Sequence, residues 1–341
     1  MGVVLAFLGL DLDVGYYLHL AKGQANLLWN REPIERVLER KDLNPEVRKR
    51  LLLIQEVKNF AQNQVGLTPS RTYSTFVDLK GNPVSWNLTA CPKDRLEPVL
   101  WSYPVVGSAP YRGYFDLRRA KKERDQLEAK GYDTYLRPVG AYSTLGWFAD
   151  PVLSSMLQYR DADLAGLVIH EMTHATVWIS GDVTFNESLA NFVGDAGALL
   201  FLSAKFGDES PIVQEVIDGR EDGRVFRRFM VGIAASLDSL YGTGLSFEDK
   251  LEGRARIFEE ARERFLELPL RTDLYASFPR WRLNNARMAL YRIYNEDVSM
   301  FEQVYEALDR DLIGAIEVFR MCEDAADPAG YLKDWLGERS P

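Results

Sequence analysis

Two of the three histidines in the chain lie four residues apart, in the segment His170-Glu171-Met172-Thr173-His174. Residues i and i+4 share one face of an α-helix, so both imidazoles can bind one metal ion. Glu171 then points to a neighbouring face, within reach of a metal-bound water. This pattern is typical of zinc hydrolases, in which two histidines bind the metal, a glutamate acts as general base and a later helix supplies the third ligand. We therefore expect one Zn²⁺ per chain.

The third ligand is expected to be a carboxylate, because the remaining histidine, His19, is remote in the sequence. We choose Glu187, since a turn at residues 180–182 would fold the next helix back across the histidine helix. Asp195, two helical turns later, is the alternative ligand. A structural role for Glu187 also stays open, because Thr184 and Glu187 fit a capping box that only closes a helix start.

Apolar residues flank the histidine motif at helical spacing, and Asp161 or Asp163 fits an N-cap, so the motif is predicted to lie on a helix. Two buried histidines without a metal are the structural alternative. Asn191 and Asp195 are expected to lie beside the ligands and to orient them through hydrogen bonds. For Asn191, a plain helix–helix hydrogen bond is an equal alternative.

The chain has 341 residues, enough for one large domain or two lobes, and a net charge of −9 that argues against nucleic-acid binding. Cys91 and Cys322 are expected to be unpaired thiols. The first ten residues are apolar but too short to span a bilayer. They fit either a packed strand or helix start, or the remnant of an export signal or anchor, so a cytoplasmic and a cell-envelope location both remain open.

Hydrophobic periodicity predicts helices over residues 16–65, strands over 71–115 and extended chain over 132–148. Residues 81–83 suit a hairpin turn between the first two strands. Helices are predicted in the remaining segments, over 117–130, 168–178, 187–206, 211–217, 223–239, 247–267, 280–295, 297–308 and 310–321. The fold class is therefore α+β and mainly helical. We divide it into a mixed lobe of residues 1–152 and a helical lobe of residues 153–341 that carries the zinc site, within one compact unit.

The chain resembles the bacterial family of predicted zinc aminopeptidases, and its zinc motif with Asn186-Glu187 is similar to the gluzincin, or thermolysin-like, arrangement. Besides the zinc motif, the segments that carry the resemblance are Tyr16-Tyr17-Leu18, Gly23-Gln24, Trp101–Gly107, Tyr111–Phe115, Ala141–Phe148, Asp150-Pro151, Phe185–Ala190 and Leu283–Ala286.

The resemblance implies a thermolysin-like zincin core with the ligand and base roles given above. It also implies that an extended edge strand above the zinc binds the substrate backbone, as in strand addition. The natural candidate is Ala141–Phe148, with Ala141, Tyr142, Ser143 and Thr144 as contacts. A buried strand that only packs on the motif helix is the alternative. Members of the family often carry a lipid-accepting cysteine before the Tyr-Tyr segment, whereas this chain has Asp13-Val14-Gly15 there, so lipidation is not supported.

A transition-state donor is expected among tyrosines and arginines, since no histidine follows His174. The predicted catalytic donors are Tyr291 and Tyr294, with Arg287 and Tyr241 as further candidates. An aminopeptidase must also hold the ammonium of its substrate, for which Asp150 and Asp195 are open candidates.

The sequence thus predicts a zinc-dependent peptidase that acts on peptide substrates, and the resemblance implies an aminopeptidase. No nucleic-acid partner and no clear membrane span are expected. A zinc hydrolase of a non-peptide amide and an inactive, zinc-stabilised binding protein are the alternative functions.

Overall fold

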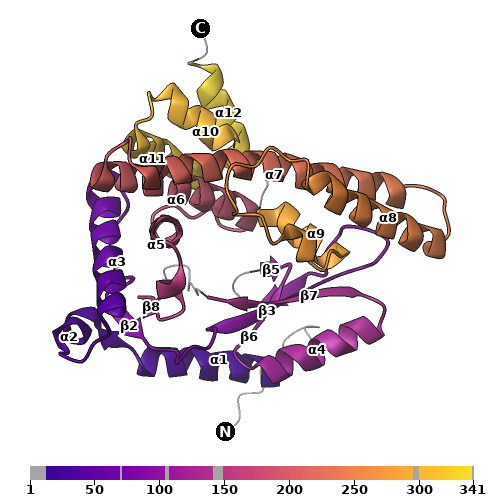
Figure 1. Ribbon diagram of the computed structural model, residues 1–341, viewed down its shortest axis with the longest axis horizontal. Helices are drawn as coiled ribbons and strands as arrows, with labels where there is room; N and C mark the ends of the chain where they lie inside the picture. Colours follow the sequence, from indigo (N-terminus) through magenta and orange to yellow (C-terminus); the bar gives the residue numbers. More distant parts are fainter. Residues whose placement is uncertain (1–12, 70, 104–106, 141–148, 295–298, 340–341) are drawn as a thin grey trace.

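A computed structural model of the chain describes residues 13–69, 71–103, 107–140, 149–294 and 299–339 (Figure 1). The α-helices in these ranges are α1 (Val14–Trp29), α2 (Ile34–Glu39), α3 (Pro45–Gln64), α4 (Leu117–Ala129), α5 (Asp161–His174), α6 (Val183–Phe206), α7 (Pro211–Tyr241), α8 (Phe247–Phe265), α9 (Asn285–Tyr294), α10 (Ser299–Ala307), α11 (Leu312–Met321) and α12 (Pro328–Gly337). The strands are β1 (Glu32–Pro33), β2 (Thr75–Val77), β3 (Ser85–Cys91), β4 (Trp101–Tyr103), β5 (Gly107–Ala109), β6 (Arg112–Tyr114), β7 (Asp133–Val139) and β8 (Val152–Leu153). The fold is mainly helical with small sheets, as predicted for an α+β protein.

Three small sheets share the described strands. Their orders are β1-β2-β8, β6-β3-β7 and β4-β5, and all pairs are antiparallel except β2 with β8. The predicted hairpin through residues 81–83 is wrong, because β2 and β3 belong to different sheets. Gly81 does take a left-handed conformation with φ of 79°, so the turn exists but leads the chain away from β2.

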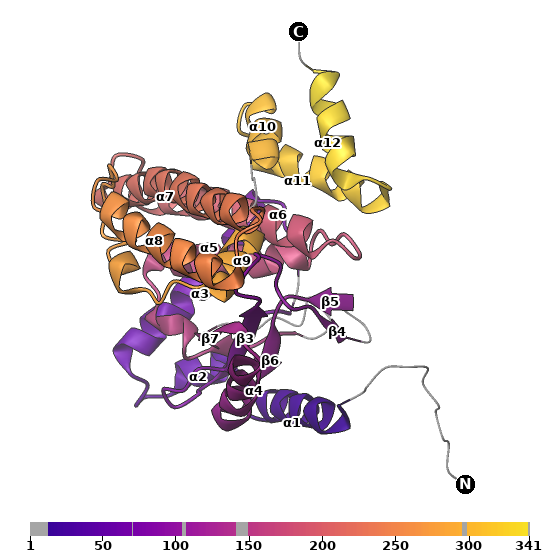
Figure 2. The same cartoon turned by 90° about the vertical axis from the view of Figure 1, so that its right-hand side faces the viewer.

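Helices cover both faces of the β6-β3-β7 sheet (Figures 1 and 2). On one side, Tyr16 of α1 and Ala120 of α4 pack with Leu88 of β3. On the other side, Ala286 and Ala289 of α9 pack against Cys91. Because these contacts hold α9 on the sheet, the side chains of α9 that face away from it project towards the motif helices.

The largest hydrophobic core joins α3 to α5 and α6. Leu51 and Ile54 of α3 are buried with Leu164 and Val168 of α5. These residues lie on both sides of the predicted boundary between residues 152 and 153, which falls within β8. The division into two lobes stays a prediction, but a single core continues across it.

The two motif helices begin with different caps from those predicted. The N-cap of α5 is Arg160, without a side-chain hydrogen bond, and Asp161 and Asp163 lie in the first turn, where their charges suit the helix dipole. The N-cap of α6 is Asp182, which accepts a hydrogen bond from the backbone N–H of Phe185 at 2.9 Å. A capping box on Thr184 is therefore excluded, because α6 already begins before it.

Helix α6 is also the most apolar long helix of the described residues. Its segment Thr184–Phe206 has the length and mean hydropathy, 1.2, of a bilayer-spanning helix, yet 56% of the tested window is buried inside the fold. Several of its side chains, among them Leu189, Val193 and Leu202, are fully buried. Its hydropathy is thus explained by a central position in the core.

Later helices follow the sequence prediction with two differences. The two helices predicted over 211–217 and 223–239 form one continuous helix, α7, since Gly219 and Gly223 are accommodated in it. Helix α12 was not predicted; it begins at Pro328, behind an Asp327 side-chain cap. The predicted free thiols, Cys91 and Cys322, are both unpaired and buried.

Helices α5 and α6 approach each other closely at two glycines. A Cβ atom added to Gly194 would lie 2.8 Å from the backbone oxygen of Gly166 and 3.2 Å from Cβ of His170. Contacts below 3.0 Å between a Cβ and backbone require one helix to move. The absence of a side chain at residue 194 therefore sets how near α6 lies to the first motif histidine.

We predict that Gly194→Ala lowers the free energy of unfolding by about 1–3 kcal/mol, because overpacking outweighs the higher helix propensity of alanine. Gly232→Ala is the matched control: Gly232 lies inside α7, and an added Cβ there meets no atom within 4 Å. This control should stabilise the protein by about 0.4–1 kcal/mol. Urea denaturation of both variants measures the difference, and a Gly194→Ala protein as stable as wild type would contradict the packing argument.

Candidate metal centre

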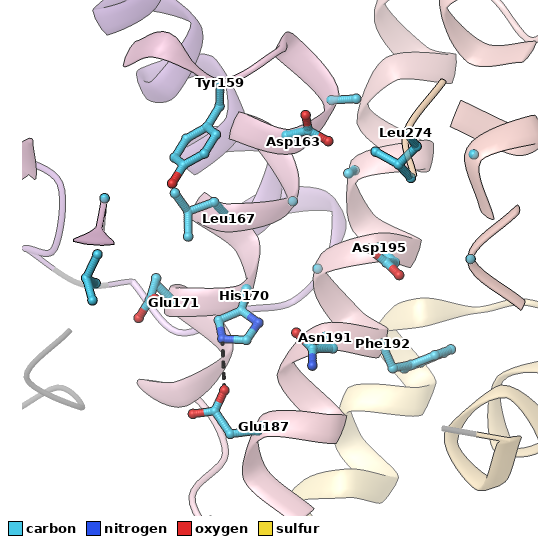
Figure 3. A pocket seen from close by; sticks show the side chains of 18 of the residues that line it. Tyr159, Asp163, Leu167, His170, Glu171, Glu187, Asn191, Phe192, Asp195 and Leu274 are labelled. Carbon is cyan, nitrogen blue, oxygen red and sulfur yellow. Dashed lines mark ion pairs between the residues drawn. The ribbon is translucent and has the colours of Figure 1, made fainter. Parts of the chain in front are cut away.

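Three predicted ligands meet where α5 faces the start of α6 (Figure 3). The Nε2 atoms of His170 and His174 lie 3.2 Å apart. The carboxylate of Glu187 reaches both, with Oε2 3.6 Å from Nε2 of His170 and Oε1 3.7 Å from Nε2 of His174. The ligand atoms of the three residues all lie within 4.8 Å of one another. Asp195 is not part of this group.

The geometry fits a tetrahedral metal ion. Zinc binds nitrogen and oxygen at about 2.0–2.1 Å, so two ligand atoms of a tetrahedral site lie about 3.3 Å apart. The three observed separations, 3.2, 3.6 and 3.7 Å, are close to that value. Two imidazoles with one carboxylate are a donor set that zinc accepts, and they leave a fourth position for water or substrate.

Burial controls the charges of these ligands. It lowers the pKa of His170 to about 4, partly offset by a side-chain hydrogen bond with Asn191, and it lowers the pKa of His174 to about 3. Burial raises the pKa of Glu187 to about 7, while the charge of Arg137 acts in the opposite direction. Both histidines are therefore neutral near pH 6, and the His–Glu contacts are not ion pairs. Neutral imidazole is the form that binds a metal.

Two asparagines position the ligands. Asn186, which is 1% exposed, accepts a hydrogen bond from the backbone N–H of Ile179 at 2.8 Å and donates one to its backbone oxygen at 2.7 Å. These two hydrogen bonds tie the α5–α6 connection to the first turn of α6, directly before Glu187. Asn191, predicted as a supporting group, hydrogen-bonds His170 through its side chain. Sequence analysis noted Asn186 as part of the motif but not its clamping role.

Glu171 faces a large cavity beside the ligands. The cavity has a volume of about 1570 Å³, and its lining includes Glu171, His170, His174 and Glu187. In Figure 3, the carboxylate of Glu171 points away from α6, on the opposite side of His170 from Asn191. Glu171 can thus contact a ligand that lies in the cavity.

Tyr73, whose pKa is affected by the charge of Glu171, is a residue that the sequence did not single out. Tyr73 is 1% exposed, and its pKa is raised well above the ordinary value by burial and by the nearby charges of Glu171 and Asp150. Its φ of 61° is in the left-handed region, which is rare for an aromatic residue. The backbone N–H of Tyr73 donates to the oxygen of Asp150 at 2.7 Å. No pattern in the sequence signals this backbone conformation.

Arg137 is a second residue that sequence analysis missed. It lies on β7 opposite Asn87 of β3, lines the cavity, and is the cation whose charge lowers the pKa of Glu187. The segment 132–148 was predicted to be extended, but its single arginine, Arg137, belongs to no sequence motif. Only the pairing of β7 with β3 brings this guanidinium to the metal centre.

Helix α9 is fixed to the sheet by two further asparagines. Asn284 donates to the backbone oxygen of Thr134 at 2.9 Å, and the side chain of Asn285 donates to the backbone oxygens of Pro92 and Arg95 at 2.9 and 3.1 Å. Tyr241, a candidate donor from the sequence, is used here: its hydroxyl donates to Oδ1 of Asn285 at 2.8 Å, and it does not line the cavity. The proposal of Tyr241 as a catalytic donor is therefore wrong.

The other predicted residues are distributed as follows. Tyr291 and Arg287 line the cavity from α9, and burial raises the pKa of Tyr291, so its hydroxyl stays protonated. The guanidinium of Arg287 stacks on Trp281, 3.7 Å from the ring centroid. The side chain of Tyr294 and the predicted substrate contacts Ala141, Tyr142, Ser143 and Thr144 lie outside the described residues.

Neither candidate for holding a substrate ammonium suits that role. Asp150 is 3% exposed and does not line the cavity. Asp195 lines the cavity, but its charge interacts with the guanidinium groups of Arg220 and Arg227. In Figure 3, its carboxylate points away from His170, which also excludes it as the third ligand in this arrangement.

The model of a family described as putative aminopeptidase matches residues 15–327. No curated protein and no solved structure matches the chain.

We predict that zinc binding at pH 5.5 releases about one proton per chain, since Glu187 must lose a proton to act as a ligand while the histidines are already neutral. With the ordinary pKa values of 6.5 for histidine and 4.5 for glutamate, the same ligands would release about two protons. Titration calorimetry in two buffers of different ionisation enthalpy counts the protons. Release of about two protons would contradict the desolvation of this site.

Proposed function

We propose a peptidase function for this chain, which belongs to the putative aminopeptidase family. The observation that carries the proposal is the convergence of His170, His174 and Glu187 beside Glu171 on one wall of the cavity. In the proposed function, the first three residues hold one Zn²⁺ and the enzyme hydrolyses a peptide bond of a substrate that lies in the cavity. When bound, zinc would polarise the scissile carbonyl and lower the pKa of a water molecule.

Glu171 is the proposed general base. It follows His170 directly on α5, lines the cavity and is not among the three converging ligands. It takes a proton from the attacking water and passes it to the leaving amine, and the peptide bond breaks as the amine is protonated.

Arg137 is the proposed donor to the negative charge that develops on the carbonyl oxygen. Its charge acts on Glu187, so it lies near the ligands, and it lines the cavity. Tyr291, with Tyr294, was a donor expected from the sequence, and its protonated hydroxyl can donate a hydrogen bond. However, the groups that affect the pKa of Tyr291 are Tyr275 and Arg227 rather than the metal ligands. We therefore favour Arg137.

The aminopeptidase preference rests on the family, because neither Asp150 nor Asp195 suits an ammonium site. The cavity supports a peptide over a smaller amide: about 1570 Å³ exceeds the roughly 300–1,000 Å³ that is common for small-molecule sites. A binding protein without activity is less well supported, because a site that only bound metal would have no use for Glu171 in the cavity.

We predict that Glu171→Gln lowers kcat by at least about 100-fold on peptides that the wild-type enzyme cleaves, because the amide cannot accept the proton of water. Zinc content should stay unchanged. Glu215→Gln is the matched control, since Glu215 also lines the cavity but hydrogen-bonds Arg160 at 3.0 Å, away from the ligands. The control should keep its activity within about twofold. Full turnover by a zinc-loaded Glu171→Gln enzyme would exclude this mechanism.

A further inference from the structure

Two arginines of α7 lie in the same cavity as the proposed metal centre. Arg220 and Arg227 are seven residues apart, so they lie on one face of the helix, about 10 Å apart along its axis. Within the described part of the chain, neither guanidinium has a carboxylate within 4.0 Å. Arg224, between them, differs: it forms ion pairs with Glu221 and Glu302.

Asp195 of α6 is the acid that faces both arginines. Burial lowers the pKa of Arg220, and the charge of Asp195 offsets this only in part. The two arginines likewise offset only part of the rise that burial causes in the pKa of Asp195, and no hydrogen bond joins Asp195 to either of them. Asp195 is exposed to the cavity, but the surrounding protein still raises the pKa of its carboxyl by desolvation. Glu302 also acts on Arg220, but it forms an ion pair with Arg224. The charges of Arg220 and Arg227 are therefore opposed by one carboxylate, Asp195, that forms no ion pair among the described residues. Desolvation without full compensation favours binding of a further anion.

Arg227 also has a buried N–H group, at Nε, that lacks a hydrogen-bond acceptor among the described residues. A buried N–H group without an acceptor is unfavourable, and this cost is larger for a charged group. Arginine is suited to a carboxylate because two of its N–H groups can bind both oxygens.

Three tyrosine hydroxyls complete this part of the cavity. Tyr275, Tyr291 and Tyr305 all line it, and the charges of Arg220 or Arg227 act on each of them. Burial raises the pKa of all three, so they stay protonated and can donate hydrogen bonds. Two guanidinium groups and three hydroxyls can thus donate hydrogen bonds here, whereas Asp195 is the carboxylate that faces both arginines and Glu302 is ion-paired with Arg224. This excess of donors suits an anionic ligand.

The distance between the two arginines with Asp195 and the proposed metal centre can be judged along α6. Asp195 follows Glu187 by eight residues on α6, a rise of about 12 Å. Figure 3 shows Asp195 on the right of the view and Glu187 below its centre, both on α6. An extended peptide rises about 3.3 Å per residue, so three to four residues cover this distance.

We propose that Arg220 and Arg227 bind a carboxylate of the peptide substrate, about three to four residues from the scissile bond. This inference rests on the proposed peptidase function and defines its substrate class as short peptides with a carboxylate at that distance. The carboxylate is either the C-terminus of the peptide or an acidic side chain.

The test uses three neutral-core pentapeptides on the full-length protein. The first has a free C-terminus, the second is amidated, and the third is amidated but carries glutamate at its fourth position. We expect kcat/KM of wild type to be at least about tenfold higher for the first or the third peptide than for the second, mainly through KM. Preference for the first identifies the C-terminal carboxylate, and preference for the third identifies the side chain.

Single substitutions on α7 test which arginines cause the preference for a carboxylate peptide. Arg220→Gln and Arg227→Gln are made separately, so that misfolding of one variant does not end the test. In each, the kcat/KM for the preferred carboxylate peptide, divided by the kcat/KM for the amidated peptide, should fall close to one. Arg224→Gln, which removes a paired guanidinium from the same helix, should keep the ratio of wild type. Equal turnover of all three peptides by wild type, or an unchanged ratio in both arginine variants, would overturn the inference while leaving the peptidase function intact.

A binding measurement separates the two proposals. Titration calorimetry of the zinc-loaded Glu171→Gln protein with the same peptides needs no turnover. Tighter binding of a carboxylate peptide that is lost in a Glu171→Gln/Arg227→Gln double variant supports the anion site, even if wild type hydrolyses none of the peptides. In that case, the peptidase function fails and the carboxylate site stands.

Discussion

Helices α5 and α6 approach each other at Gly166 and Gly194, and the arrangement of the candidate metal centre depends on this contact. With only hydrogen at residue 194, the backbone of α6 lies against Cβ of His170. The start of α6 then lies opposite the histidine face, and the Asn186 clamp on Ile179 fixes its first turn. A wider separation would move Glu187 away from both imidazoles and expose them to water.

The same packing sets the chemistry of the site through desolvation. Burial keeps the histidines neutral, which is the form that binds a metal. It also raises the pKa of Glu187 to about 7, so that without a bound cation this carboxyl is protonated below neutral pH. A bound cation would favour the charged carboxylate again. Along the cavity, the same principle applies to Arg220 and Arg227, whose desolvated charges are only partly balanced by Asp195. If both proposals hold, one cavity combines a cation-binding end with an anion-binding end.

The local part of this structure was accessible from the sequence, and the non-local part was not. Spacing alone placed His170 and His174 on one face, and the turn before α6 was enough to choose Glu187 over Asp195. Capping was misjudged, because Thr184 and Asp182 are both good caps and only the backbone decides between them. The hairpin failed for a related reason: Gly81 signals a turn, but not which strand the chain meets next. Arg137 was missed because strand pairing, which the sequence does not encode locally, brings it to the site.

We propose that His170, His174 and Glu187 form a zinc site. The most direct test is the zinc content of purified protein after incubation with zinc and dialysis, for wild type, His174→Ala and Asp195→Asn. We expect about one zinc per chain in wild type and in Asp195→Asn, and less than about a tenth of that in His174→Ala, since loss of one of three ligands weakens binding severely. Wild-type protein without zinc, or His174→Ala with a full complement, would contradict the account.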